Sequence, residues 1–349
     1  MNLTLICISY NRPAFLKRLI RYHQFFMKNA KLLIMDGSNF SLEVSIYNKE
    51  NIIYKSCPGS SYFDRWIESG QYLKTKYTLL IGDDEFYLPS TITNCINFLE
   101  KNKNYITCGG KPILFTIFFK KIIHVMPVYE GISSNEKKLA LDRQRQWLKD
   151  TLPVSIYSVI RTYFFKNIIR SLKKIDRKLF NDPSNIIEDI VELTSAYQGK
   201  NKILSKYSWF RSQENKRISL NNFSEPPHEF WKKNNLKKKF FINIAYEILL
   251  KQKKKHLANY KKNLDIDYFL HFQKYQKNKK NIFKIVKKQI IKIFFLLIPT
   301  CIKKFIRYKF RINGLEIEKF FKTQSGYNLH EIKKIKKLIL NFYKNKETS

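Results

Sequence analysis

Short apolar runs alternate with amphipathic stretches through the first hundred residues of the chain. Residues 3–8 form a continuous apolar run, which is typical of a strand buried in a parallel sheet. Residues 14–27 follow with apolar side chains at helical spacing, and Pro89, a residue favoured at the first helical position, begins another predicted helix. This alternation predicts a parallel α/β sheet covered by helices. The other predicted elements here are strands at 31–35, 52–54, 77–81 and 105–108 and a helix near 61–73.

Beyond residue 112 the pattern is mixed. Residues 113–119 and 122–125 read as paired strands, and Thr162 is placed as the N-cap of a helix that follows a returning strand at 155–160. Past Pro226-Pro227 the composition changes to Lys-rich amphipathic helices, which predicts one domain over 1–225 and a basic helical C-terminal region over 226–349. The remaining predicted elements are helices at 136–148 and 185–197 and a strand at 203–207.

The composition indicates a folded, basic protein. Of its 349 residues 44% are hydrophobic, enough for a sizeable core, and this excludes an extended disordered chain. Five cysteines, without CxxC spacing, favour a reducing compartment over a disulfide framework or a zinc site. The N-terminus lacks a basic segment typical of signal peptides, and no apolar stretch reaches the roughly 20 residues of a membrane span. We therefore expect neither a signal peptide nor a transmembrane helix.

The net charge of +38 is concentrated in the last third of the chain. Residues 1–230 hold 34 basic and 21 acidic side chains, whereas residues 231–349 hold 32 and 7. Such a concentration favours an anionic partner, either lipid head groups or nucleic acid, although a general bias toward Lys, Asn, Ile and Phe is an alternative source of the overall excess.

Three segments of this region, 282–298, 300–311 and 329–342, carry an apolar stripe backed by lysines. Amphipathic helices of this kind can lie in the interface of an anionic membrane. The alternative is a helical domain packed on the rest of the chain with solvated lysines. Nucleic acid is disfavoured as a partner because the aromatic residues lie on the apolar stripes and not between basic residues.

Polar clusters follow three of the early predicted strands, where the crevice of a doubly wound sheet binds ligands. They are Ser9-Tyr10-Asn11-Arg12, Asp36-Gly37-Ser38 and Gly82-Asp83-Asp84-Glu85. Three successive carboxylates repel one another and suggest a divalent cation, the alternative being a solvated turn that caps the helix beginning near Pro89. A second acidic pair, Glu188-Asp189, suits either a general base or an interaction with the dipole of its own helix.

Taken in order, these motifs resemble the family 2 inverting glycosyltransferases. The resemblance covers roughly residues 1–215 and implies a GT-A fold, a Rossmann-like mixed sheet flanked by helices, with a nucleotide-sugar donor. The commonest form of the acidic motif in that family is Asp-x-Asp-Asp, whereas this chain has Gly82 at the first position. The motifs that carry the resemblance are Ile8-Ser9-Tyr10-Asn11-Arg12-Pro13 through Leu16, Asp36-Gly37-Ser38, Leu80-Ile81-Gly82-Asp83-Asp84-Glu85 with Pro89, and Glu188-Asp189.

The resemblance implies a role for each of these positions. Asp36 corresponds to the carboxylate that recognises the nucleotide base, and Asp83 belongs to the DxD-like motif, with Asp84 and Glu85 expected at Mn²⁺ or Mg²⁺. Asp189 corresponds to the catalytic base, with Glu188 beside it, and Arg211 to a basic position at the diphosphate or acceptor. The first-strand loop that lines the nucleotide corresponds to Ser9, Tyr10, Asn11 and Arg12.

The expected activity is direct displacement of a UDP-, dTDP- or GDP-linked sugar by a hydroxyl of a glycan or lipid-linked acceptor. Surface polysaccharide or lipopolysaccharide synthesis would suit such an enzyme, which we expect in the cytoplasm, peripheral to the inner face of the plasma membrane. The alternative is a non-catalytic protein that keeps the GT-A fold and docks on membranes or polyanions through its basic helices.

Overall fold

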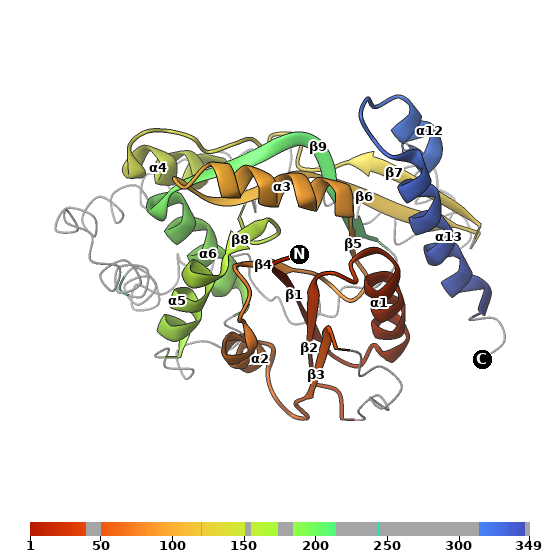
Figure 1. Ribbon diagram of the computed structural model, residues 1–349, viewed down its shortest axis with the longest axis horizontal. Coiled ribbons are helices and arrows are strands. Elements are labelled where there is room, and N and C mark those ends of the chain that lie inside the picture. The colour runs from red at the N-terminus through yellow and green to blue at the C-terminus, as the bar shows by residue number, and fades with distance from the viewer. Residues whose placement is uncertain are drawn as a thin grey trace, which may run out of the picture.

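The computed structural model describes residues 1–39, 50–119, 121–150, 155–173, 184–213 and 314–345, together with residue 243. These parts form a mixed sheet covered by helices on both faces, so the predicted α/β fold class is confirmed (Figure 1). The predicted stripes at 282–298 and 300–311 lie outside the described residues. None of the described helices is long and apolar enough to cross a membrane.

The sheet has a parallel half and a largely antiparallel half. In the parallel half β1 pairs with β2 on one side and β4 on the other, and β3 adds to β2, which gives the order β3-β2-β1-β4 of a Rossmann-like sheet. The first four strands are β1 (Leu3–Ser9), β2 (Lys31–Asp36), β3 (Ile52–Ser56) and β4 (Tyr77–Leu80).

The antiparallel half is built on β6, the longest strand. It pairs antiparallel with β7 and β8 and parallel with β9, and β8 joins it to β4 of the parallel half. The predicted pairing of 113–119 with 122–125 is confirmed as the β6–β7 hairpin. The strands are β5 (Phe86–Tyr87), β6 (Tyr105–Phe118), β7 (Ile122–Pro127), β8 (Val159–Arg161), β9 (Lys200–Ser212) and β10 (Leu315–Glu316).

The helices divide between the two faces. In β1, Leu3, Leu5 and Cys7 pack under one set of helices and Ile6 under the other, as expected of alternating side chains in a strand. The first face carries α1 (Pro13–Phe26), α3 (Pro89–Lys101), α12 (Ile317–Lys322) and α13 (Leu329–Asn345). The second face carries α2 (Tyr62–Ser69) with the 3₁₀ turn η2 (Gly70–Tyr72), α4 (Ala140–Asp150), α5 (Thr162–Leu172) and α6 (Ser184–Gln198).

Two local predictions near β8 are wrong. The strand expected at 155–160 is only Val159–Arg161, because residues 155–158 form a turn whose backbone bonds to Glu192 of α6. Thr162 does not cap α5: the N-cap is Arg161, without a side-chain cap bond, and the Thr162 hydroxyl bonds to the Thr78 hydroxyl at 2.6 Å. A cross-strand partner therefore takes the hydroxyl that the sequence pattern assigns to a cap.

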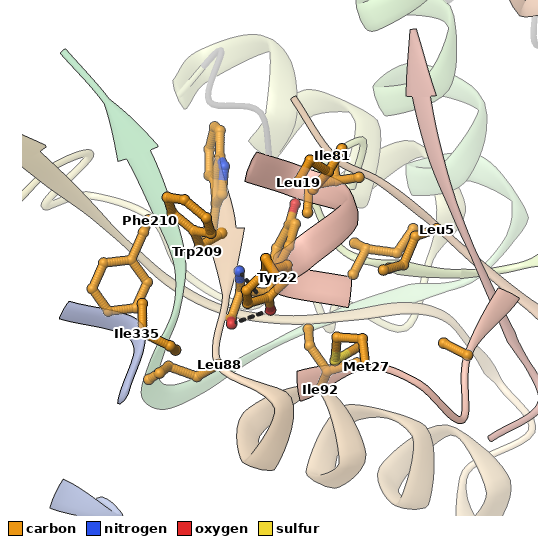
Figure 2. Packing of buried hydrophobic residues seen from close by; sticks show 14 of the residues in the cluster. Leu5, Leu19, Tyr22, Met27, Ile81, Leu88, Ile92, Trp209, Phe210 and Ile335 are labelled. Atoms are coloured by element: carbon orange, nitrogen blue, oxygen red, sulfur yellow. Dashed lines mark hydrogen bonds between the residues drawn. The ribbon is translucent and has the colours of Figure 1, made fainter. Parts of the chain in front are cut away.

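The C-terminal segment is part of the same core. β10 extends the sheet beside β7, and Ile335 of α13 is fully buried in the cluster that holds Tyr22 and Trp209 (Figure 2). Phe342 of α13 packs against Phe15 of α1, with ring centroids 5.1 Å apart. The apolar stripe predicted at 329–342 thus faces the protein. The domain boundary predicted near 225 stays a prediction.

We expect Ile335→Ala to destabilise the whole described fold. Truncating a fully buried aliphatic side chain costs about 2–5 kcal/mol, and all four tryptophans precede α13, so their fluorescence reports on the other elements. Urea unfolding followed by that fluorescence is expected to show a lower midpoint. Lys337→Ala, exposed on the same helix, is the control and is expected to change stability by less than about 0.5 kcal/mol. An unchanged midpoint for Ile335→Ala would mean that α13 folds separately.

Candidate active site

Three polar clusters converge because β1 runs parallel to both of its neighbours. Ser9 pairs with Asp36 in the register of β1 and β2, and the Gly82–Glu85 turn follows β4 on the other side of β1. Side-chain hydrogen bonds join the clusters. The Asn11 N–H donates to Ser38 Oγ at 2.7 Å, and Ser9 Oγ donates to Asp83 Oδ2 at 2.8 Å. The structure thus brings the three polar clusters, which the sequence predicts to bind the nucleotide sugar, to one edge of the sheet.

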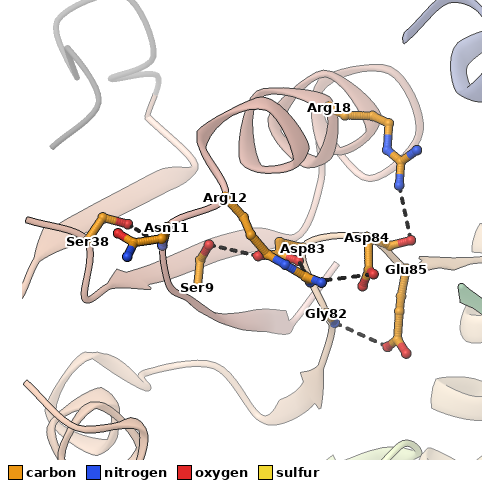
Figure 3. Close-up of polar contacts among 9 residues, drawn as sticks. All are labelled: Ser9, Asn11, Arg12, Arg18, Ser38, Gly82, Asp83, Asp84 and Glu85. Carbon is orange, nitrogen blue, oxygen red and sulfur yellow. Dashed lines mark hydrogen bonds and ion pairs between the residues drawn. The ribbon is translucent and has the colours of Figure 1, made fainter. Parts of the chain in front are cut away.

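Asp83 is a buried carboxylate held by two donors. It is 4% exposed, and burial raises its pKa above the ordinary value. Ser9 and Arg12 oppose this shift, because Ser9 bonds to Oδ2 and Arg12 Nη1 lies 2.7 Å from Oδ1 (Figure 3). Both carboxylate oxygens of Asp83 are therefore engaged by protein groups.

Asp84 lies next to two guanidinium groups. Its Oδ2 is 3.4 Å from Nη1 of Arg12, and its backbone carbonyl accepts a hydrogen bond from Nη2 of Arg18 at 3.2 Å. Arg18 is 2% exposed and its guanidinium lies 4.7–4.9 Å from the ring centroids of Phe15, Phe86 and Phe342. Since Phe342 belongs to α13, the C-terminal helix helps to hold the cation that supports the acidic turn.

Glu85 turns back toward the sheet. Its Oε2 accepts the N–H of Trp209 at 2.9 Å and the backbone N–H of Gly82 at 3.3 Å. Burial, with the charge of Asp84, raises the pKa of Glu85 to about 8. A Cβ at position 82 would lie 3.0 Å from Glu85 Cδ, so glycine there makes room for this conformation.

The residues of this turn do not fit a metal ion held by Asp84 and Glu85. Nucleotide sites hold Mg²⁺ or Mn²⁺ through one or two carboxylates and phosphate oxygens. Here Arg12 faces both Asp83 and Asp84, while Glu85 bonds to Trp209. Within the described residues no group of three or more His, Cys, Asp or Glu side chains is placed to hold a metal. The predicted Mn²⁺ or Mg²⁺ site stays a prediction that these contacts disfavour.

Asp36 is also engaged at the end of β2. Its Oδ1 accepts the N–H and hydroxyl of Ser38 at 3.0 and 2.5 Å, and its Oδ2 accepts the Tyr54 hydroxyl at 2.8 Å. The side chain is 3% exposed. A nucleobase N–H that bonds to Asp36 would therefore donate to a carboxylate that already accepts three hydrogen bonds from Ser38 and Tyr54. The role predicted for Asp36 in base recognition stays a prediction.

Arg65 of α2 lies beside the candidate site and was not predicted from the sequence. It is 3% exposed, and a Cβ on Gly37 would lie 1.2 Å from its Nη1, so only glycine allows this approach. Its guanidinium lies 5.7 Å from the ring centroid of Tyr10, which is 43% exposed. Among the described residues its Nε has no hydrogen-bond partner. Gly37 was the available signal in the sequence, because a glycine there indicates that another group packs close to the backbone. It does not indicate that this group is the side chain of Arg65.

Glu188 and Asp189 lie in the second turn of α6. The first turn of that helix carries no acidic residue, so the alternative of a simple helix-dipole interaction at its start is not supported. Glu188 Oε1 accepts the Tyr157 hydroxyl at 3.2 Å. Burial, with the charge of Glu188, raises the pKa of Asp189 to about 7. An acid with a pKa near neutrality is suited to take up a proton under physiological conditions.

Stacked aromatic rings connect the two acidic motifs. The ring centroids of Tyr157 and Trp209 lie 4.0 Å apart at an interplanar angle of 15°. The Tyr157 hydroxyl bonds to Glu188, and the Trp209 N–H bonds to Glu85. Arg211, predicted at the diphosphate or acceptor, lies over the rings of Trp209 and Tyr129 and donates to the Tyr129 hydroxyl. No spacing pattern predicts this stack, because its members come from distant segments of the chain.

Glu192 anchors the turn that carries Tyr157. Its Oε1 accepts the backbone N–H groups of Ser155 and Ile156 at 2.7 and 2.9 Å, and the side chain is 2% exposed. Burial raises its pKa to about 8, so Glu192 is largely protonated at neutral pH. It lies one turn after Glu188 and positions the ring that bonds to Glu188.

We expect Glu192 to make the protein less stable as pH rises. The folded state holds this proton up to about pH 8, whereas the unfolded chain releases it near pH 4.3. Between those values the unfolding free energy falls by up to about 1.4 kcal/mol per pH unit. Glu192→Gln keeps an acceptor for both N–H groups and is expected to make this slope shallower by about 1 kcal/mol per unit at pH 6–7.

Urea unfolding at several pH values measures that slope. Glu136→Gln is the matched control. Burial acts to raise the pKa of Glu136, but hydrogen bonds from Tyr105 and Lys202 outweigh it and hold the pKa below the ordinary value, so Glu136 is ionised throughout this range. Equal slopes for wild type and Glu192→Gln would contradict the buried, protonated state of Glu192.

No family model matches the chain, and no curated protein does. Among solved structures, the chain is similar to S. aureus TarS, at 13% identity and a TM-score of 0.44, covering 79% of this chain and 55% of that one. It thus spans about half of that TarS chain. TarS 1-349 matches at 12% identity over 80% and 92% of the two chains (TM-score 0.45), and its complex with UDP-GlcNAc at 14% over 71% and 72% (TM-score 0.41). At these values the likeness is remote and adds nothing to the assignment of a function.

Proposed function

We propose that this protein is an inverting glycosyltransferase of the family 2 type, using a nucleotide-sugar donor. The observation that carries the proposal is the arrangement of two acidic motifs around one edge of the sheet. The Gly82–Glu85 turn lies at the ends of β1, β2 and β4, and the stack of Trp209 on Tyr157 connects it to Glu188 beside Asp189. This arrangement supports a nucleotide-donor site and a candidate base in one region of the molecule.

The donor side of the proposed site has cationic and aromatic groups suited to a nucleoside diphosphate. Arg65 is a buried guanidinium beside the Asp36 loop whose Nε has no partner among the described residues, and a phosphate oxygen would satisfy it. Tyr10 presents an exposed ring over the same loop. The proposed donors are UDP-, dTDP- or GDP-linked sugars, with Asp36 as the contact to the base.

The proposed reaction is a single displacement at the anomeric carbon. Asp189 takes the proton of the acceptor hydroxyl as its oxygen forms the new bond to that carbon, and the bond to the diphosphate oxygen breaks with its electron pair leaving on the nucleotide. Attack from the face opposite the leaving group inverts the configuration. General-base assistance of this kind is worth about 10²–10⁴-fold in rate.

The proposed acceptor is a hydroxyl of a glycan or a lipid-linked glycan, in the synthesis of surface polysaccharide or lipopolysaccharide. Support for an anionic membrane partner comes from the concentration of positive charge beyond residue 230. α13 contributes exposed Lys333, Lys334 and Lys337 to that charge, while its apolar stripe packs on the protein. A location peripheral to the inner face of the plasma membrane remains part of the proposal.

Nucleotide binding is the first test of this function. We expect one of UDP, dTDP, GDP and CMP to raise the melting temperature selectively, because a ligand that binds only the native state stabilises it by mass action. Arg65→Gln is expected to lose most of that shift. The control Arg170→Gln, which changes an exposed arginine of α5 that bonds to Asn167, is expected to keep it. No shift with any nucleotide would favour the non-catalytic alternative.

We expect Asp189→Asn to lower turnover by at least 100-fold while nucleotide binding is retained. The amide has nearly the same shape but cannot accept the proton. In the wild type, the pKa of about 7 means that kcat/KM rises as pH increases through 7, since the base acts in its ionised form. Sugar transfer from pH 5.5 to 8.5, to a glycan or lipid-linked acceptor on which the wild type is active, measures the loss of turnover and the pH dependence. Near-normal turnover in Asp189→Asn would reject Asp189 as the base.

A further inference from the structure

Arg12 lies where a cation is needed at the acidic turn. A single nitrogen, Nη1, is 2.7 Å from Asp83 Oδ1 and 3.4 Å from Asp84 Oδ2, so the guanidinium bridges the two carboxylates (Figure 3). The Asp83 side chain is 4% exposed and that of Asp84 is 16% exposed. A positive charge in this position removes the repulsion between two adjacent, largely buried carboxylates.

The backbone places Arg12 in this position. It is the N-cap residue of α1, directly before Pro13, and its carbonyl accepts the N–H of Leu16. The preceding Asn11 has a φ of 54° and donates its N–H to Ser38 Oγ, so the loop is fastened to the end of β2. The guanidinium also lies 5.6 Å from the ring centroid of Phe15. The start of α1 and the attachment of Asn11 to Ser38 therefore fix the backbone of Arg12, and the Phe15 ring contacts its guanidinium.

The two aspartates of the turn already have protein partners. Arg12 faces both carboxylates, and Arg18 bonds to the backbone carbonyl of Asp84. Both oxygens of Asp83 are engaged, and Oε2 of Glu85 accepts two N–H groups. A divalent ion would have to displace a guanidinium to reach two carboxylate ligands.

We propose that Arg12 takes the place of a divalent metal at this turn, so that the wild-type protein binds its donor nucleotide without Mn²⁺ or Mg²⁺. The guanidinium carries a permanent charge and a fork of N–H donors, which can face carboxylates on one side and a diphosphate on another. The inference rests on the proposed nucleotide-sugar function for the identity of the anion, but not for the cation position itself.

Direct measurement of Mn²⁺ binding by electron paramagnetic resonance tests the cation position in the full chain without nucleotide. We expect wild type and Arg12→Lys to bind Mn²⁺ no more tightly than about millimolar, and Arg12→Gln to bind it at least tenfold more tightly. In the double variant Arg12→Gln/Asp84→Asn, the gain in Mn²⁺ affinity is expected to be lost. Circular dichroism establishes that the variants fold. A wild-type site with micromolar Mn²⁺ affinity that Asp84→Asn removes would overturn the proposal, and this result needs no Arg12 variant.

The nucleotide-induced melting shift, measured with and without metal, separates this inference from the proposed function. The melting shift given by the selected nucleotide is expected to be the same in EDTA and in Mn²⁺ for the wild type. A shift that disappears in EDTA and returns with Mn²⁺ would overturn the role of Arg12 while supporting the nucleotide site. An absence of any nucleotide shift would count against the proposed function, and the Mn²⁺ measurement would still decide the role of Arg12.

Discussion

The parallel pairing of β1 on both of its edges is the constraint on which the candidate site depends. Because β2 and β4 run in the same direction as β1, the loops that follow all three strands leave the sheet at one edge. Residues separated by more than 70 positions, such as Ser9 and Asp83, thereby come within hydrogen-bond distance. An antiparallel neighbour on either side would send one of these clusters to the opposite edge.

That convergence creates an electrostatic problem, which the structure solves with arginine. Carboxylates brought to one edge lose water, and an unpaired buried charge is costly. Three arginines reach this edge: Arg12 from the N-cap of α1, Arg18 from α1 and Arg65 from α2. Each guanidinium lies against an aromatic ring as well as polar groups. Aromatic faces stabilise a guanidinium that has little contact with water. The acidic motif is therefore inseparable from the basic and aromatic residues around it.

The sequence was sufficient to predict the elements that depend on local pattern. The apolar run of β1, the helix after Pro13 and the helix carrying Asp189 lie close to their predicted positions, since burial on one face imposes a period that the sequence displays. Trp209, which bonds to Glu85 over 124 positions, had no such signal. The apolar stripe of α13 was ambiguous for a related reason: a helix packed on a sheet and one lying on a membrane have the same periodicity, and only tertiary packing distinguishes them.

Two buried acids on either side of the aromatic stack show how similar burial leads to different chemistry. Burial raises the pKa of Glu85 to about 8 and that of Asp189 to about 7. Glu85 is surrounded by Trp209 and the backbone of Gly82, whose hydrogen bonds fix it within the turn. Asp189 lies instead on a helix where the neighbouring carboxylate, Glu188, is the one that bonds to Tyr157. Hydrogen bonding, and not burial alone, therefore separates a carboxyl group that is fixed within the turn from one suited to exchange a proton.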